Sequence, residues 1–279
     1  MKVIAMSSCA GSPKFAAKGA GEYAFSMGYP APEDGYAAAQ WAFKSRGWTR
    51  AYLLIDQFLD YCKTSGAGFE QRFKELGGTI VLKDTFSNPD PSIATQISKL
   101  KKVVGKVDVI MHASFPPGGA SAIRQIRAAG IDLPMVSGDG HDGAFWMDAT
   151  PNLSNWYTMD YGSIHGDDPR PEFNELCDAI EKRYGERPIA SNVSTGYDVG
   201  QAFILALERT GGKTDGDSLK RAIESFKCEN FMTGKVSFSP ELHACQGRDY
   251  YVVETQNGKR SYLEKVQQGL LPNLRDFVK

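Results

Sequence analysis

The chain has 279 residues, of which 42% are hydrophobic and 23% charged, with a net charge of -1. This composition is that of a globular protein of one or two domains with an apolar core, and the near-neutral charge excludes a general attraction to nucleic acid or anionic membranes. The apolar run Val107–Ala113 is much shorter than the ~18 residues of a membrane span, and no signal peptide precedes the strand-like residues 2–5.

Short apolar strands alternate with amphipathic helices in the first half of the chain. Ala51–Ile55 is apolar at every position, as in a parallel strand buried on both faces. The helices show apolar residues three and four positions apart, and Gly77–Gly78 ends the first of them. We expect strands at 51–55, 79–82, 107–112 and 133–136, and helices at 66–76, 93–100 and 120–129. This succession predicts an open parallel α/β sheet with helices on both faces.

The rhythm changes after Asn155, where an extended segment leads into a Gly-, Asp- and Pro-rich linker. A helix that begins near Asp217 has this residue as its expected N-cap, and Gln256–Lys259 forms a turn into the last strand. We expect helices at 171–184, 194–210 and 217–226, and strands at 234–238 and 250–254. These helices have few strands to pack on, because only residues 2–6 obviously supply one. We therefore expect this half of the chain to lack part of the sheet that its helices need for a complete hydrophobic core.

The five cysteines are an odd number and include no C-x-x-C pair, which argues against a zinc or thioredoxin-type site. Cys228 and Cys245 flank the hairpin expected around residues 234–240. A disulfide between them would fit an oxidising compartment, and two separate thiols are the alternative.

Polar residues follow several of the expected strands, which is where ligands of open α/β sheets bind. The loop Met6–Pro13 is small and rich in hydroxyls, so its main-chain N–H groups could hold a carboxylate. Tyr61 carries a phenol that can donate one hydrogen bond. Ser114 or Phe115 lies at a bend after another strand, and Asp139, between glycines, can pair with an ammonium group. Each of these candidate residues could instead be an ordinary turn or packing residue.

No set of residues favours catalysis. The four histidines are scattered without metal-ligand spacing, no G-x-S-x-G elbow occurs, and the loop after the first strand is neither a Walker loop nor a dinucleotide fingerprint. His141 with Asp139 and Asp142 could bind a metal ion, although a polar turn is the plainer interpretation. We expect no metal, no cofactor and no enzymatic activity.

A set of segments spread over essentially the whole chain keeps the order and spacing of a known family. They are Ile4–Pro13, Ile55–Gly66, Arg124–Gly130, Ser137–Asp142, Thr195–Gln201 and Thr233–Pro240. In these segments the chain resembles the type I periplasmic binding proteins of branched-chain amino acid ABC transporters, the leucine/isoleucine/valine-binding group. The resemblance implies two Rossmann-like lobes, joined by a hinge of crossing strands, that close on a ligand. Lobe one, incomplete, would comprise residues 1–28 and 163–245, and lobe two residues 29–162 and 246–279.

The resemblance also implies which residues meet the ligand. The first loop of lobe one would hold the ligand's carboxylate, and Asp139 its ammonium group. Tyr61 and Tyr197 match tyrosines of the family's cleft, and Phe115 or Ser114 falls near the wall of the side-chain pocket. The loop residues implied are Ser7, Ser8, Cys9, Ala10 and Ser12.

This chain departs from the family pattern in two ways. Family members usually begin with roughly a hundred further residues that supply the first strands of lobe one, so the chain is either a fragment or is completed by another chain. Cys62 stands where a glycine is usual and the bend Phe115–Pro117 is unusual. The ligand is therefore open among aliphatic amino acids, amides and aromatic acids, all of which relatives bind.

The resemblance implies a small-molecule ligand, a membrane permease as partner, and a periplasmic or extracellular, membrane-anchored location. It also implies a monomer unless another chain completes lobe one. A ligand-binding sensor domain of a receptor is the main alternative, because the same fold serves both roles. A transcription repressor would need a helix-turn-helix before the core, and a hydrolase would need a nucleophile beside a histidine.

Overall fold

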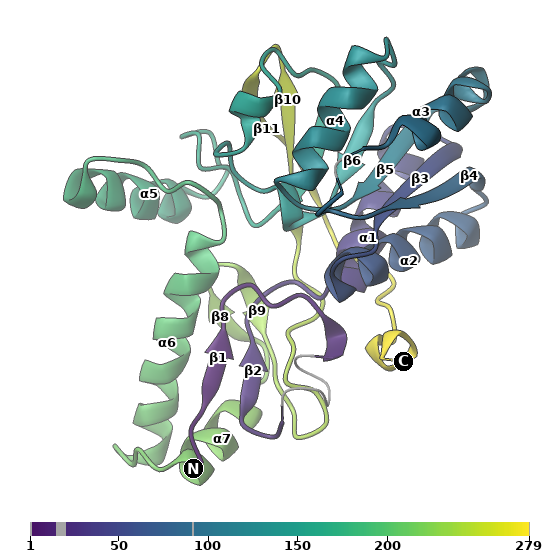
Figure 1. The fold of residues 1–279 in the computed structure, drawn as a ribbon. Helices are drawn as coiled ribbons and strands as arrows, with labels where there is room; N and C mark the ends of the chain where they lie inside the picture. Colours follow the sequence, from purple (N-terminus) through teal and green to yellow (C-terminus); the bar gives the residue numbers. More distant parts are fainter. Residues whose placement is uncertain (1, 15–20, 91, 279) are drawn as a thin grey trace.

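The computed structural model describes residues 2–14, 21–90 and 92–278, which form a larger and a smaller body (Figure 1). The larger body is built on a seven-stranded sheet, and the smaller body contains a two-stranded parallel sheet and a separate two-stranded hairpin. The chain passes between the bodies at residues 27–30, 161–192 and 246–249.

The seven-stranded sheet has the order β11-β10-β7-β6-β5-β3-β4. Its strands are β3 (Arg50–Asp56), β4 (Thr79–Phe86), β5 (Val109–Ala113), β6 (Met135–Ser137), β7 (Trp156–Asp160), β10 (Tyr250–Gln256) and β11 (Lys259–Val266). The strands from β4 to β7 are parallel, as the sequence predicts, whereas β10 and β11 are antiparallel. Asn257 and Gly258, at φ 52 and 73, form the tight turn between β10 and β11.

Helices cover both faces of this sheet, because side chains along β3 alternate between two apolar clusters. Leu53 packs with Phe69 of α2 (Asp60–Glu75), in the cluster that also includes α1 (Ala31–Gln40). Leu54 packs with Ile123 of α4 (Gly118–Ala128), in the cluster that includes α3 (Ala94–Lys101). The two-faced parallel architecture expected from the sequence is confirmed.

Close packing of α1 against α2 explains why the sequence pattern places the start of α2 too late and does not predict α1. Glycine lowers helix propensity, so the pattern indicates a start at residue 66, whereas α2 begins at Asp60. A Cβ on Gly68 would lie 2.3 Å from the Pro32 carbonyl oxygen, and one on Gly35 would lie 2.1 Å from that of Ser65. The glycines are therefore contact points between helices. The sequence pattern does not predict α1, whose glycine and buried carboxylates hide its apolar face.

The smaller body has far less sheet. Its elements are β1 (Ala5–Ser7), β2 (Ala24–Ser26), α6 (Val193–Thr210), α7 (Gly216–Glu224), β8 (Glu229–Phe231) and β9 (Gly234–Val236). β1 and β2 are parallel, and one apolar cluster joins Phe25 and Met27 to the two helices. The N-cap of α7 is Asp215, not the predicted Asp217, because the Asp215 side chain accepts the N–H of Ser218. α5 (Pro171–Tyr184) lies to the side of this body (Figure 1).

Three tyrosines form one stack where the chain passes between the bodies. The ring of Tyr29 lies between those of Tyr161 and Tyr250, with centroid distances of 4.1 and 4.0 Å. Tyr29 lies in the first passage, Tyr161 begins the second, and Tyr250 begins β10 directly after the third; all three residues are buried.

All five cysteines are unpaired, with Cys228 exposed and Cys245 buried. Of the two possibilities for this pair, the structure therefore shows separate thiols. Within residues 2–14, 21–90 and 92–278, no helix combines the length and apolar character needed to cross a membrane.

Candidate functional site

A cleft of about 580 Å³ lies where the two bodies meet. Both bodies and the second passage between them contribute to its walls. The lining residues are Cys9, Ala10, Gly11, Ser12, Leu59, Asp60, Tyr61, Phe115, Asp139, Gly140, Asp142, Tyr161 and Asn192. A cleft of this size can bury a small molecule.

The loop after β1 is folded by its own first hydroxyl. Ser7 Oγ accepts the N–H groups of Cys9 (3.3 Å) and Ala10 (3.0 Å), and Ser26 Oγ donates to the Ala10 carbonyl (2.7 Å). Ser7 therefore shapes the loop, and two of the N–H groups expected to hold a ligand are already bound to it. The loop presents Cys9, Ala10, Gly11 and Ser12 to the cleft, whereas Ser7 and Ser8 lie outside its walls.

Tyr61 stands in the first turn of α2 and lines the cleft with its ring. Its hydroxyl donates to Asp34 Oδ2 (2.8 Å) and accepts the N–H of Gly140 (2.8 Å). The single hydrogen bond that a phenol can donate is therefore made to Asp34, not kept for a ligand. A Cβ on Gly11 would lie 2.9 Å from Tyr61 Cδ2, so the loop of the smaller body packs directly on this ring.

Asp139 begins a short 3₁₀ turn, Asp139–His141, between two glycines. Asp139 Oδ2 accepts the hydroxyl of Tyr161 (2.8 Å), which in turn accepts the N–H of Tyr29 (2.8 Å). A Cβ on Gly138 would lie 2.7 Å from Asp34 Oδ2, so only glycine lets this turn approach α1 so closely. The turn therefore places Asp139 in the cleft wall above Asp34.

The two carboxyl groups share one buried environment. Burial and the neighbouring Asp139 charge raise the pKa of Asp34 well above its usual range. Burial also raises the pKa of Asp139, against the effect of its hydrogen bonds. Asp34 is fully buried and Asp139 is half-buried. Two such neighbouring carboxyls cannot both ionise readily, so we assign the proton to Asp34 and the negative charge to Asp139.

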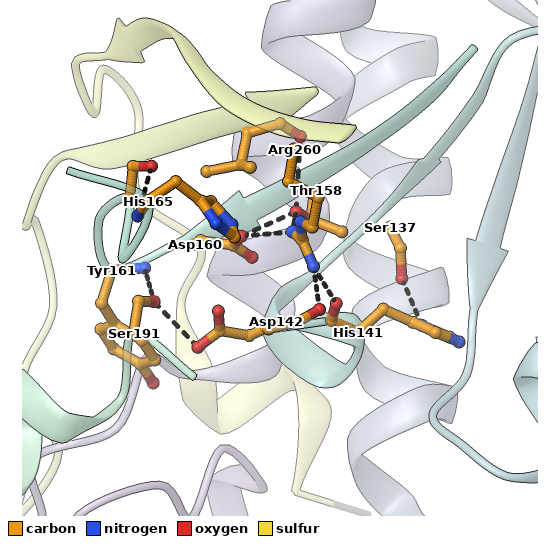
Figure 2. Close-up of polar contacts among 12 residues, drawn as sticks. Ser137, His141, Asp142, Thr158, Asp160, Tyr161, His165, Ser191 and Arg260 are labelled. Carbon is orange, nitrogen blue, oxygen red and sulfur yellow. Dashed lines mark hydrogen bonds and ion pairs between the residues drawn. The ribbon is translucent and has the colours of Figure 1, made fainter. Parts of the chain in front are cut away.

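Asp142 follows on the same loop and links it to the second passage (Figure 2). Its Oδ2 accepts the Ser191 hydroxyl (2.8 Å) and the Asn192 N–H (3.1 Å). Arg260 donates to Asp160 Oδ2 (2.8 Å) and to the carbonyl oxygens of His141 and Gly143. Arg260 thereby fixes the loop on β7.

Several expected site residues lie elsewhere. Ser114 is buried and donates to Asp56 Oδ2 (3.0 Å), whereas its neighbour Phe115 lines the cleft. Tyr197 is 44% exposed on α6 and lines a separate hollow with Phe231. The structure therefore brings together Cys9, Ala10, Ser12, Tyr61, Phe115 and Asp139, and not Ser7, Ser8, Ser114 or Tyr197.

Sequence reasoning did not single out Asp34, Asp142, Tyr161 or Asn192 as ligand-site residues. Tyr161 follows the end of β7 and Asp142 shares the loop of Asp139, so the rule that sites follow strand ends could have found both. Asp34 gives no such signal, because it belongs to a helix that the sequence pattern does not predict.

The part of the chain that the structure describes contains no convergence of three His, Cys, Asp or Glu side chains that could hold a metal ion. His141 instead contacts Ser137 Oγ through Nδ1 (3.1 Å) and packs beside His112, Trp146 and Trp156. His141 is fully buried and belongs to the core, with its ring directed toward Ser137 (Figure 2).

Comparisons with known proteins agree with this architecture. The model of the periplasmic binding protein family matches residues 2–260. Leu/Ile/Val-binding protein homolog 7 of Brucella suis is 23% identical over 174 residues, which are 60% of this chain and 42% of that protein. The chain thus spans less than half the length of this curated relative.

Two solved structures share the fold. The leucine binding protein LivK of Thermotoga maritima superposes with a TM-score of 0.81 at 21% identity, covering 95% of this chain and 73% of that one. A solute binding protein of R. palustris in complex with benzoate gives a TM-score of 0.79 at 18% identity, covering 96% and 72%.

The chain therefore belongs to the periplasmic binding protein family and has its type I fold. The family that the sequence resemblance predicts is confirmed.

Proposed function

We propose that this chain is the solute-binding component of an ABC importer that works outside the cytoplasm and binds a small polar ligand in its cleft. The observation that carries the proposal is a cleft lined by both bodies, with the carboxylate of Asp139 in its wall. Proteins with the same fold include one named for leucine and one solved with benzoate.

The proposed mechanism is closure of two lobes about the passages between them. The lobes correspond to residues 1–28 with 163–245 and residues 29–162 with 246–279. The Cys9–Ser12 loop faces the ligand from the first lobe, with Ser12 as its hydroxyl donor, and Tyr61, Phe115 and Asp139 face it from the second. The partner that receives the ligand is a membrane permease.

Asp139 is the partner proposed for a ligand ammonium group. It is the charged member of a carboxyl pair in the cleft wall, and an ammonium group would neutralise it through a charge-assisted hydrogen bond. The walls contain no histidine beside Cys9 or Ser12 among the described lining residues, so the arrangement favours binding over nucleophilic catalysis.

The test is isothermal titration calorimetry with free amino acids, their amides and aromatic carboxylates, followed by Asp139→Ala. A buried hydrogen bond to a charged group contributes about 1.5–3 kcal/mol, so the variant should bind an amino-acid ligand about ten- to a hundredfold more weakly. Asp148→Ala, on an exposed site away from the cleft, is the control. Unchanged affinity in Asp139→Ala would remove this role, and a wild-type protein that binds no compound of the panel would contradict the proposed function.

A further inference from the structure

The cleft carries more negative charge than one ammonium group requires. Its described lining residues include Asp60, Asp139 and Asp142, and none of them is lysine, arginine or histidine. Asp60 is neutralised at the rim by Lys14 and Lys63, each at 3.1 Å. Asp139 and Asp142 remain as two carboxylates without a basic side chain in the wall.

Asp142 is nearly buried, at 7% exposure, and has only polar partners. The Ser191 hydroxyl and the Asn192 N–H occupy its Oδ2. Arg260 donates to Asp160 Oδ2 and to the main-chain carbonyl of His141, and among the described residues it makes no hydrogen bond or ion pair with Asp142 (Figure 2).

Burial raises the pKa of Asp142 to about 6, and the Asp139 charge adds to the rise while Arg260 opposes it. Burial and the Asp142 charge also raise the pKa of Asp160, on the other side of Arg260. Burial destabilises the charged form of Asp142, so a cation that reaches this carboxylate would stabilise it.

We propose that Asp142 is a specificity-determining residue of the cleft, and that Asp139 and Asp142 together select a ligand with two separate amine or amidine groups, such as a basic amino acid or an α,ω-diamine. This inference rests on the proposed function and narrows its ligand class. The methylene chain of such a ligand would lie against the apolar side chains of the wall, Leu59, Tyr61, Phe115 and Tyr161. A simple aromatic acid would meet two carboxylates and no basic side chain.

A purely structural role of Asp142 can be separated from this one by Asp142→Asn. The amide oxygen of asparagine can still accept the hydrogen bonds of Ser191 and Asn192, while the charge is removed. Asp148→Asn is the matched control, because Asp148 is exposed and lies outside the cleft.

The experiment measures the dissociation constants of lysine, ornithine, 1,4-diaminobutane, leucine and benzoate at pH 7.5 by calorimetry. The wild-type protein should bind at least one dicationic or basic probe more tightly than leucine and benzoate. Asp142→Asn should weaken that probe ten- to a hundredfold and change leucine binding less than threefold, with a melting temperature no lower than that of the wild type.

Equal affinity of wild type and Asp142→Asn for the basic probes would overturn the inference. So would tighter binding of leucine or benzoate than of every basic probe, which would leave the proposed function intact. If no probe binds the wild-type protein, the inference fails; the proposed function fails with it only if the wider panel of amino acids, amides and aromatic carboxylates also shows no binding.

Discussion

The larger and smaller bodies contain similar helices but differ in what those helices pack on. In the larger body, apolar clusters lie on both faces of a seven-stranded sheet. In the smaller body one cluster serves a two-stranded parallel sheet, two helices and a short hairpin, and Val3 and Ile204 are 53% and 51% exposed. The comparison shows that how fully a core is enclosed depends on how many strands the helices can pack on, and not on the helix sequences alone.

Equal truncations in the two bodies should therefore have unequal costs. Ile126 of the larger body and Ile223 of the smaller are both buried. We expect Ile126→Ala to lower the free energy of unfolding by about 4 kcal/mol and Ile223→Ala by about 2 kcal/mol, because a less enclosed site can relax around the lost side chain. Urea denaturation, with hydrogen exchange to assign each loss to its body, measures both. Equal costs would show that the smaller core is as closed as the larger one.

The glycine contact between α1 and α2 offers a sharper test of the larger body. Gly68→Ala would place a methyl group against the backbone of Pro32, and we expect a loss of about 3 kcal/mol from overpacking. Gly200→Ala, in α6 of the smaller body, meets nothing within 4 Å and should stabilise the protein by about 0.5 kcal/mol. Thermal unfolding of both variants measures the contrast, and a neutral Gly68→Ala would mean that the helices can separate freely.

The buried carboxylate of Glu33 makes the larger body sensitive to pH. Glu33 Oε1 accepts the Gly247 N–H (2.8 Å), and burial raises the pKa of Glu33 to about 7 from 4.5. Since the folded state holds this proton more tightly than the unfolded state, the group lowers stability progressively from pH 4.5 to 7 and by a constant amount above. Glu33→Gln should therefore be more stable than wild type by about 2 kcal/mol at pH 8, and equally stable at pH 4.

Melting temperatures at the two pH values check this difference. Glu175→Gln, an exposed change on α5, is the control and should show no pH-dependent gain. A Glu33→Gln advantage that is the same at pH 4 and pH 8 would contradict the assigned cause.

The sequence predicts the parallel sheet because β3 is apolar from Ala51 to Ile55, β5 is mostly apolar, and the helices of this half repeat their apolar residues regularly. The bounds of α5 match the predicted residues 171–184 for the same reason. α1 escapes prediction because Glu33 and Asp34 are buried by tertiary contacts, which no local pattern reveals. The same limit applies to the site: Asp139 and Tyr61 follow from their place after strands, whereas the Asp34 carboxyl that engages Tyr61 does not. Tyr197 was expected in the cleft from resemblance alone, but it lies on the exposed side of α6, opposite the buried side that carries Asp198.

The stack of Tyr161, Tyr29 and Tyr250 sets the kind of movement that the two bodies can make. Tilting one body against the other would separate two pairs of rings at once, since each ring lies in or directly beside a different passage of the chain. Turning about the axis through the ring centres keeps the faces in contact. The stack therefore favours rotation of the two bodies about the axis through the ring centres over bending between them. Because the Tyr161 hydroxyl donates to Asp139, this rotation axis is linked directly to the wall of the cleft.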